Sequence, residues 1–292
     1  MNNVQHHIIP KSYLQAWCDV NIPDKHEPYI WVFSNTTHTS KKKAPLNDFF
    51  CENNFYTVLN DDGSRDLSIE HELGRIEGAF VKIRDNKLLQ HKTLSFEERF
   101  QVCLFVAALH SRTKKSINNM SNVFQPMLSQ LEKMIESKQQ LSSNEVVLIS
   151  NDSKETIPIE TLEDIVANPI EHLMPTFIDT VSKSLLEFEL AVFYTKKDKV
   201  FITTDNPCVW FDSQAHTRHP MYQSVGLKYE STEIILPISP THCIVLKRKG
   251  INGYINIDTN SPSIDIINTL LYKSSDEHYY SNSKEEILFL ES

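Results

Sequence analysis

The chain has 292 residues, of which 40% are hydrophobic, and a formal net charge of -9 at pH 7. A chain of this length and apolar content can bury a substantial core, so we expect a folded protein rather than a disordered one. The acidic balance argues against broad electrostatic attachment to nucleic acid or to an anionic membrane, because that affinity comes mainly from clustered Lys and Arg.

The five cysteines are scattered singly, and none of them forms a CxxC pair. This spacing argues against a disulfide framework or a zinc knuckle and favours a reducing compartment. The first residues contain no basic stretch followed by an apolar run, which a secretory signal would need. No window reaches the roughly 18 apolar residues of a membrane-spanning helix. We therefore expect a cytoplasmic protein with no membrane association.

Residues 1–67 are predicted to form a loop-rich α/β segment. Apolar residues recur at helical spacing just after Pro10, which indicates a short opening helix. Two later apolar runs, 29–33 and 55–59, are typical of strands.

Residues 68–187 are predicted to form a helical layer. From Ser68, apolar residues recur every three or four positions, as on one stripe of an amphipathic helix. Ser95 and Glu98 have the spacing of a capping box, and the helix that they begin is apolar on nearly all sides, so it should be buried. Further helices are predicted over 119–138, 160–167 and 169–187, with a strand at 146–149 and with Pro175 beginning or kinking the last helix.

Residues 188–292 are predicted to be rich in strands. Apolar or alternating runs indicate four strands, followed by a helix over 262–273 and a last strand over 278–281. The four runs are 190–194, 200–204, 233–237 and 243–246. The polar loop 196–199 between the first two has the length of a hairpin connection.

These elements predict one α+β domain over residues 1–292. We expect a central helical layer packed on a C-terminal, mainly antiparallel sheet, with the loop-rich N-terminal α/β segment packed against that sheet. Whether the helical middle is a separate layer or wraps the sheet is left open by the sequence.

The adjacent residues His6 and His7 are the first candidates for chemistry. Imidazoles titrate near neutrality and can act as a base, an acid or a metal ligand. Neighbouring side chains point in different directions unless the backbone turns, so one functional histidine, His7, is favoured over two. The alternative is that these histidines anchor the start of the chain through hydrogen bonds.

Two carboxylates are candidates on the first long helix. Glu70 and Glu77 are seven residues apart and return to nearly the same side of a helix, so both could face a cleft and hold a divalent cation. The alternative is that they lie on a solvated helix face.

Arg112 follows the buried apolar run of the second long helix. A guanidinium in such a place is usually paired with a carboxylate or directed at a bound anion. The two alternatives are therefore an anion-binding residue and a buried ion pair, for which Glu70 or Glu77 is the expected partner.

Asp205 and Asn206 follow a predicted strand and precede a proline. Strand ends often position catalytic groups, because the sheet holds them rigidly. The alternative is an Asx turn, in which Asp205 caps its own backbone.

Six short motifs follow one another at wide spacing over nearly the whole chain. They are His7-x-x-Pro10 with Tyr13-Leu14, Phe55-Tyr56, Glu70 with Ile76-Glu77, Arg112-Thr113, Thr204-Asp205-Asn206-Pro207, and Leu236-Pro237-Ile238-Ser239-Pro240. In this order and spacing they resemble the bacterial family of proteins of unknown function numbered 4238. The resemblance implies that His7, Glu70, Glu77, Arg112 and Asp205 are recurring polar positions that converge on one site.

These residues suggest a metal-dependent phosphodiester hydrolase, a nuclease-like effector. Asp205 with Glu77, and Glu70 beside it, would bind Mg²⁺ or Mn²⁺, His7 would be general base or acid, and Arg112 would stabilise charge on the phosphate. A role in anti-phage defence rests on the type of family alone.

The alternative is a non-enzymatic module that recognises a nucleotide or a protein partner, in which the same residues form a structural ion-pair network. Group transfer from a nucleotide would use the same residue types. The expected partner is accordingly a nucleic acid, a nucleotide or another protein.

Overall fold

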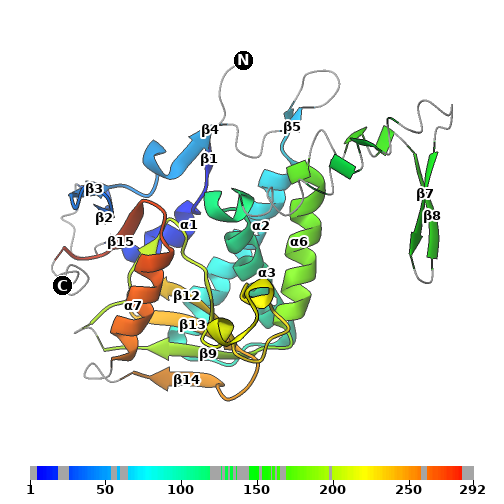
Figure 1. The fold of residues 1–292 in the computed structure, drawn as a ribbon. Helices are drawn as coiled ribbons and strands as arrows, with labels where there is room; N and C mark the ends of the chain where they lie inside the picture. The colour runs from blue at the N-terminus through cyan, green and yellow to red at the C-terminus, as the bar shows by residue number, and fades with distance from the viewer. Residues whose placement is uncertain are drawn as a thin grey trace.

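The structure is a computed structural model with an α+β architecture (Figure 1). No helix in the part of the chain that it describes is long and apolar enough to cross a lipid bilayer. The structure describes residues 5–18, 26–53, 58–59, 65–118, 145–150, 153–158, 169–196, 199–257 and 262–284, together with isolated positions between 126 and 164.

A five-stranded sheet has the strand order β11-β12-β13-β9-β14. Neighbouring strands are antiparallel except for β14, which runs parallel to β9. The apolar runs of its central strands β12 and β13 are buried, as expected for strands covered on both faces. The strands are β9 (Glu189–Tyr194), β11 (Val209–Asp212), β12 (Thr232–Ser239), β13 (His242–Lys247) and β14 (Gly253–Asn256).

A second, four-stranded sheet joins the two ends of the chain in the order β10-β15-β2-β3, and all its neighbours are antiparallel. Figure 1 shows β2 and β3 from the N-terminal part beside β15 from the C-terminal part. These strands are β2 (Ile30–Ser34), β3 (Ser40–Lys43), β10 (Thr203–Thr204) and β15 (His278–Ser281). Three strand pairs stand apart from both sheets: β1 (Gln5–His7) with β4 (Cys51–Asn53), β5 (Val58–Leu59) with β6 (Arg65–Asp66), and β7 (Glu145–Ser150) with β8 (Ser153–Pro158).

The predicted helical layer is confirmed, and its long helices begin where the sequence indicates. Ser95 accepts a hydrogen bond from the Glu98 N–H, and the Glu98 side chain accepts one from the Ser95 N–H, which completes the capping box. Pro175 lies inside the last of these helices rather than at its start. The helices are α2 (Ser68–Asn86), α3 (Phe96–Ser111) and α6 (Pro169–Leu185).

The shorter helices are distributed along the chain. Near the N-terminus, the Trp17 indole N–H donates to the Phe201 carbonyl oxygen, at 3.3 Å. These helices are α1 (Lys11–Leu14), the 3-10 turns η1 (Gln15–Trp17), η2 (Asp48–Phe50), η3 (Leu88–Gln90), η4 (Ala215–Thr217) and η5 (Pro220–Tyr222), and α7 (Ser263–Ser274).

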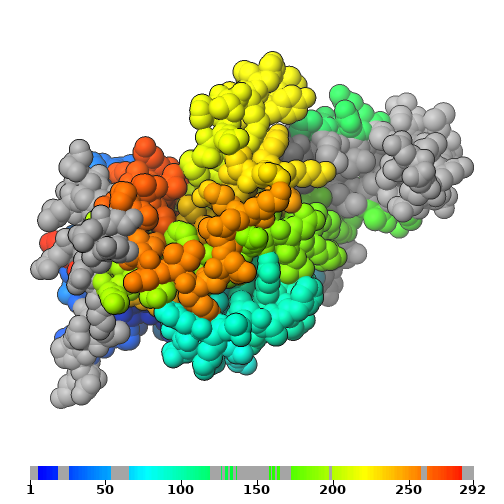
Figure 2. All heavy atoms as spheres, turned by 90° about the horizontal axis from the view of Figure 1, so that it is seen from below, coloured from blue at the N-terminus to red at the C-terminus, as the bar shows by residue number. Residues whose placement is uncertain are grey.

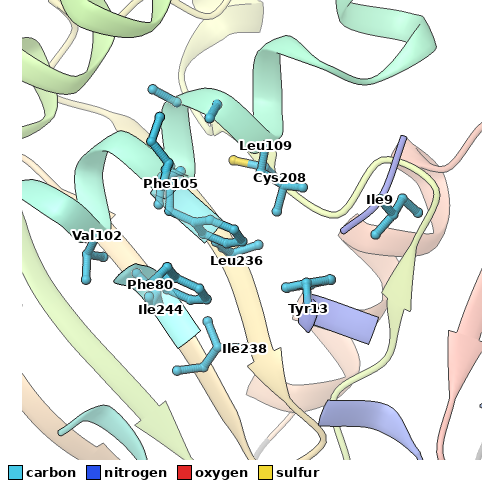
Figure 3. Close-up of a cluster of buried hydrophobic side chains, with 14 of the residues drawn as sticks. Ile9, Tyr13, Phe80, Val102, Phe105, Leu109, Cys208, Leu236, Ile238 and Ile244 are labelled. Atoms are coloured by element: carbon cyan, nitrogen blue, oxygen red, sulfur yellow. The ribbon is translucent and has the colours of Figure 1, made fainter. Parts of the chain in front are cut away.

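The main apolar core lies between the helical layer and the five-stranded sheet. Figure 3 shows Phe80 of α2 and Phe105 of α3 packed against Leu236 of β12, and the two phenylalanine rings are stacked with centroids 3.7 Å apart. Tyr13 of α1 belongs to the same cluster, and its hydroxyl lies 2.8 Å from Thr203 Oγ1 and donates to the Pro237 carbonyl oxygen. One cluster therefore contains residues from all three predicted subregions.

The hairpin expected between strands 190–194 and 200–204 does not form. β9 lies between β13 and β14, whereas only Thr203–Thr204 is a strand, and it pairs with β15 in the other sheet. The Ile202 N–H instead donates to the Asn268 side-chain oxygen of α7, at 3.0 Å. A polar side chain on α7 thus satisfies backbone that the apolar pattern alone assigns to a strand. The predicted strand residues 55–57, most of the predicted helix 119–138 and half of the predicted helix 160–167 lie outside the described residues.

Candidate functional site

The two N-terminal histidines lie on β1, where pairing with β4 fixes their directions. His6 lies opposite Glu52 and His7 opposite Cys51. Successive side chains on a strand point to opposite faces, so the two rings have different surroundings. His6 is buried, with 2% of its surface exposed, whereas His7 is half-buried.

The strand register brings a thiol to His7. Its Nδ1 lies 3.3 Å from Cys51 Sγ. Burial lowers the pKa of His7, and hydrogen bonding to the Pro45 backbone acts in the opposite direction. Burial, together with the Asp48 carboxylate, raises the pKa of the Cys51 thiol. Both shifts favour a neutral imidazole beside a neutral thiol over the thiolate–imidazolium pair of reactive cysteines.

Arg112 joins three segments of the chain. It caps the C-terminus of α3, and its guanidinium donates to the Glu77 carboxylate of α2 and to the backbone carbonyl of His7 on β1. The Arg112 side chain is 6% exposed and the Glu77 side chain 20% exposed. The arrangement matches the buried ion pair weighed from the sequence, with Glu77 rather than Glu70 as the partner. This largely buried ion pair therefore holds β1 against α2 and α3.

A cavity of about 270 Å³ lies beside this ion pair. Most of the residues that the sequence singles out line this cavity. They include Glu70, which is exposed in the first turn of α2. Its lining residues are His6, His7, Lys11, Glu70, Leu73, Gly74, Glu77 and Arg112.

Asp205 lies in a different environment, at the end of β10. Its carboxylate accepts three backbone N–H bonds, from Asp276, Glu277 and His278, at 2.8, 2.7 and 2.7 Å. Burial raises the pKa of Asp205, while these three bonds act to lower it. The carboxylate thus caps the loop between α7 and β15 rather than its own backbone, and it does not line the cavity beside Glu77.

Asn206 is buried, and it joins the same segments. Its side-chain amide donates to the Ser274 carbonyl oxygen at the end of α7, at 3.1 Å. Its own N–H donates to Thr204 Oγ1, also at 3.1 Å. Asp205 and Asn206 together therefore hold the end of α7 and the following loop against β10.

A larger cavity, of about 520 Å³, lies next to Asp205. The N-terminal segment borders both cavities, because Ile8 and Ile9 line the larger one and His6 and His7 the smaller. Its polar lining is mixed in charge. The lining residues are Ile8, Ile9, Phe49, Phe50, Cys51, Glu52, Lys114, Lys115, Asn118, Asp205, Asp276, Glu277, His278 and Tyr280.

One rim of the larger cavity is aromatic and basic. Phe49 is partly exposed, and its ring lies edge-on to His278, with ring centroids 4.8 Å apart. The ammonium groups of Lys41 and Lys43 lie 4.3 and 5.8 Å from the centre of the Phe49 ring. Both lysines come from β3, a charged edge strand that the sequence pattern did not reveal because it has no apolar residues.

Two of the carboxylates expected to hold a metal ion, Glu77 and Asp205, have protein partners in this structure. Within the described residues, no group of three or more His, Cys, Asp or Glu side chains is placed to hold a metal ion. Glu77 is paired with Arg112, and Asp205 with backbone N–H groups.

Comparisons with known proteins identify one family. No curated protein and no solved structure matches the chain. A family model described as "Protein of unknown function (DUF4238)" matches residues 5–287, which is nearly the whole chain and includes every candidate site residue. The chain therefore belongs to the DUF4238 family.

Proposed function

We propose that this protein binds a nucleotide, free or within a single strand, at the larger cavity and at the Phe49 ring on its rim. One observation supports this proposal above the others: Phe49, a partly exposed ring that lines a 520 Å³ cavity, has the ammonium groups of two lysines over it. A base can stack on such a ring while nearby ammonium groups neutralise its phosphate.

The local charge at this rim differs from that of the whole chain. β3 presents three consecutive lysines in a protein of net charge -9. On the cavity wall, Lys114 is paired with Glu52, and Lys115 donates to the Ser274 carbonyl oxygen at 3.1 Å. The remaining carboxylates, Asp276 and Glu277, are acceptors that suit ribose hydroxyls or base amino groups.

In this proposal, the ion pair between Arg112 and Glu77 is structural. It holds His7, and thereby the N-terminal segment, which contributes Ile8 and Ile9 to the larger cavity. The protein is then a nucleotide-binding module in which this ion pair holds in place the N-terminal residues that line the binding cavity.

Phosphodiester hydrolysis is a second candidate, favoured by the smaller cavity. Two carboxylates, Glu70 and Glu77, line it together with His7 and Arg112. In this hypothesis His7 is the general base or acid and Arg112 stabilises the phosphate. Cleavage of single-stranded DNA or RNA that requires Mg²⁺ or Mn²⁺ and is lost in His7→Ala is the result that this candidate requires.

Binding is tested with calorimetry for mononucleotides and with fluorescence anisotropy for labelled single-stranded oligonucleotides, in the presence and absence of Mg²⁺. If a strand binds, its affinity should fall with salt, and Lys43→Gln should reduce the log–log salt slope by about 0.7, the value for one phosphate contact. Lys183→Gln is the control, because this exposed lysine on α6 pairs with Asp179 and does not line either cavity. Absence of binding to both ligand types at low salt would refute the proposal.

A further inference from the structure

Two histidines from distant parts of the chain meet where the helical layer contacts the five-stranded sheet. His91 directly follows η3, His242 begins β13, and their Nε2 atoms are 3.0 Å apart. Figure 2 shows the turquoise atoms of the segment after α2 against the orange atoms of the β13–β14 region. The histidine pair therefore bridges two layers of the fold, away from both cavities described above.

Local structure holds His91 in place. Its φ of 53° is left-handed, and the following Lys92 N–H donates back to the Lys87 carbonyl oxygen at 2.9 Å. Glycine or asparagine is the usual residue where a helix ends in this way. The imidazole lies between two tyrosine rings of the sheet, Tyr194 and Tyr254, with centroids 4.2 and 4.8 Å away.

The other ring nitrogen of His242 has a hydroxyl partner. Nδ1 lies 2.8 Å from Thr241 Oγ1 and 3.5 Å from Ser239 Oγ. When Nδ1–H donates to Thr241, the Nε2 lone pair faces His91. The 3.0 Å separation is that of a hydrogen bond, in which the Nε2–H of a neutral His91 ring donates to this lone pair. A hydrogen bond on the second nitrogen is what usually orients a metal-binding histidine.

The separation of the two nitrogens indicates a coordination geometry. Metal–nitrogen bonds of roughly 2.0–2.1 Å place cis ligands of a square-planar or octahedral ion about 2.8–3.0 Å apart, and ligands of a tetrahedral ion about 3.3–3.4 Å apart. The observed 3.0 Å fits the first class, which Cu²⁺ and Ni²⁺ prefer with nitrogen and oxygen ligands.

We propose that His91 and His242 form a binding site for Cu²⁺ or Ni²⁺, in which the His91 ring carries its hydrogen on Nδ1, the two Nε2 lone pairs bind the cation and water completes the coordination sphere. His91 is exposed, so a hydrated ion can reach the pair. No third His, Cys, Asp or Glu joins them within the described part of the chain, so the site should be exchangeable. Because the two ligands belong to different layers, the bound ion should also strengthen the contact between the helices and the sheet.

Titration of the full-length protein with CuCl₂ or NiCl₂ tests this proposal. Electron paramagnetic resonance of bound Cu²⁺ should report two equatorial imidazole nitrogens, and the metal should raise the melting temperature of the wild type. His91→Asn, which tolerates the left-handed backbone, and His242→Ala should lose both signals. Thr241→Val, which removes the orienting hydroxyl, should weaken binding by about tenfold or more.

His216→Ala is the matched control, because His216 is an exposed histidine on η4. It should leave the affinity and the spectrum unchanged. Circular dichroism shows whether each variant is folded, and His91→Asn provides the test if His242→Ala does not fold. The proposal is overturned if wild type and His91→Asn bind the metal equally, or if His216→Ala removes the binding.

Discussion

Removing Glu77 should destabilise the protein more than removing its partner. Glu77→Ala leaves the Arg112 guanidinium, which is 6% exposed, without the carboxylate, whereas Arg112→Met leaves a carboxylate that is 20% exposed and can be hydrated. Breaking a buried ion pair from one side costs about 3–5 kcal/mol. Because Glu77 is partly exposed, we expect about 3 kcal/mol for Glu77→Ala and about 2 kcal/mol for Arg112→Met.

Urea unfolding measures both losses, and unchanged m values would show that the extent of unfolding is the same. The double variant should lose less than the sum of the two single variants by at least about 1 kcal/mol, because the residues are in contact. Glu72→Ala is the control on the same helix: Glu72 pairs with Arg75 at 2.9 Å, but the two side chains are 64% and 69% exposed. It should cost less than about 0.5 kcal/mol. A loss for Glu77→Ala no greater than this would refute the reasoning.

Two other predictions concern stability. The His110 ring stacks on Trp210 at 4.1 Å, and burial lowers the His110 pKa to about 4. In the unfolded chain the His110 imidazole takes up a proton near pH 6.5, so acidification favours unfolding. His110→Phe should therefore reduce the difference in unfolding free energy between pH 7 and about pH 4.5 by about 2–3 kcal/mol. An unchanged difference would contradict this prediction. Asp205→Ala removes the acceptor of three N–H groups and should lower the free energy of unfolding, measured in urea, by about 3 kcal/mol. Asp205→Asn keeps one acceptor oxygen and should lose less stability. Equal losses for the two variants would show that the carboxylate is not the cap.

The helices could be predicted from the sequence because their signals are local. The apolar stripe from Ser68 and the capping box at Ser95 each lie within a few turns of chain, and α2 and α3 begin where they indicate. The final strand, 278–281, was likewise predicted with its observed bounds. Strand partners could not be predicted in this way, since β10 pairs with a strand more than seventy residues later in the chain.

The sequence singles out His6, His7, Glu70, Glu77 and Arg112, which line the smaller cavity, but it does not specify how they are arranged. The sequence spacing places Glu70 and Glu77 on one side of α2. Which of them pairs with Arg112 depends on where the end of α3 packs along α2, and the structure shows that it is Glu77. The proximity of Cys51 to His7 depends on strand register, which no local pattern specifies. The Asp205 carboxylate accepts hydrogen bonds from backbone N–H groups 71 to 73 residues away. The predicted local Asx turn therefore has the correct kind of bond, from backbone N–H to carboxylate, but the donors lie in a distant loop.

The affinity of Phe49→Ala for single-stranded oligonucleotides tests the proposed function most directly. Loss of one stacked base is worth about 1–3 kcal/mol, so binding should weaken by about fivefold or more relative to wild type. Phe96→Ala is the matched aromatic control, because Phe96 is 74% exposed at the start of α3 and lines neither cavity. Weaker binding by Phe49→Ala with unchanged binding by Phe96→Ala is the result we predict. Equal binding by wild type and both variants would contradict a nucleotide site at this cavity.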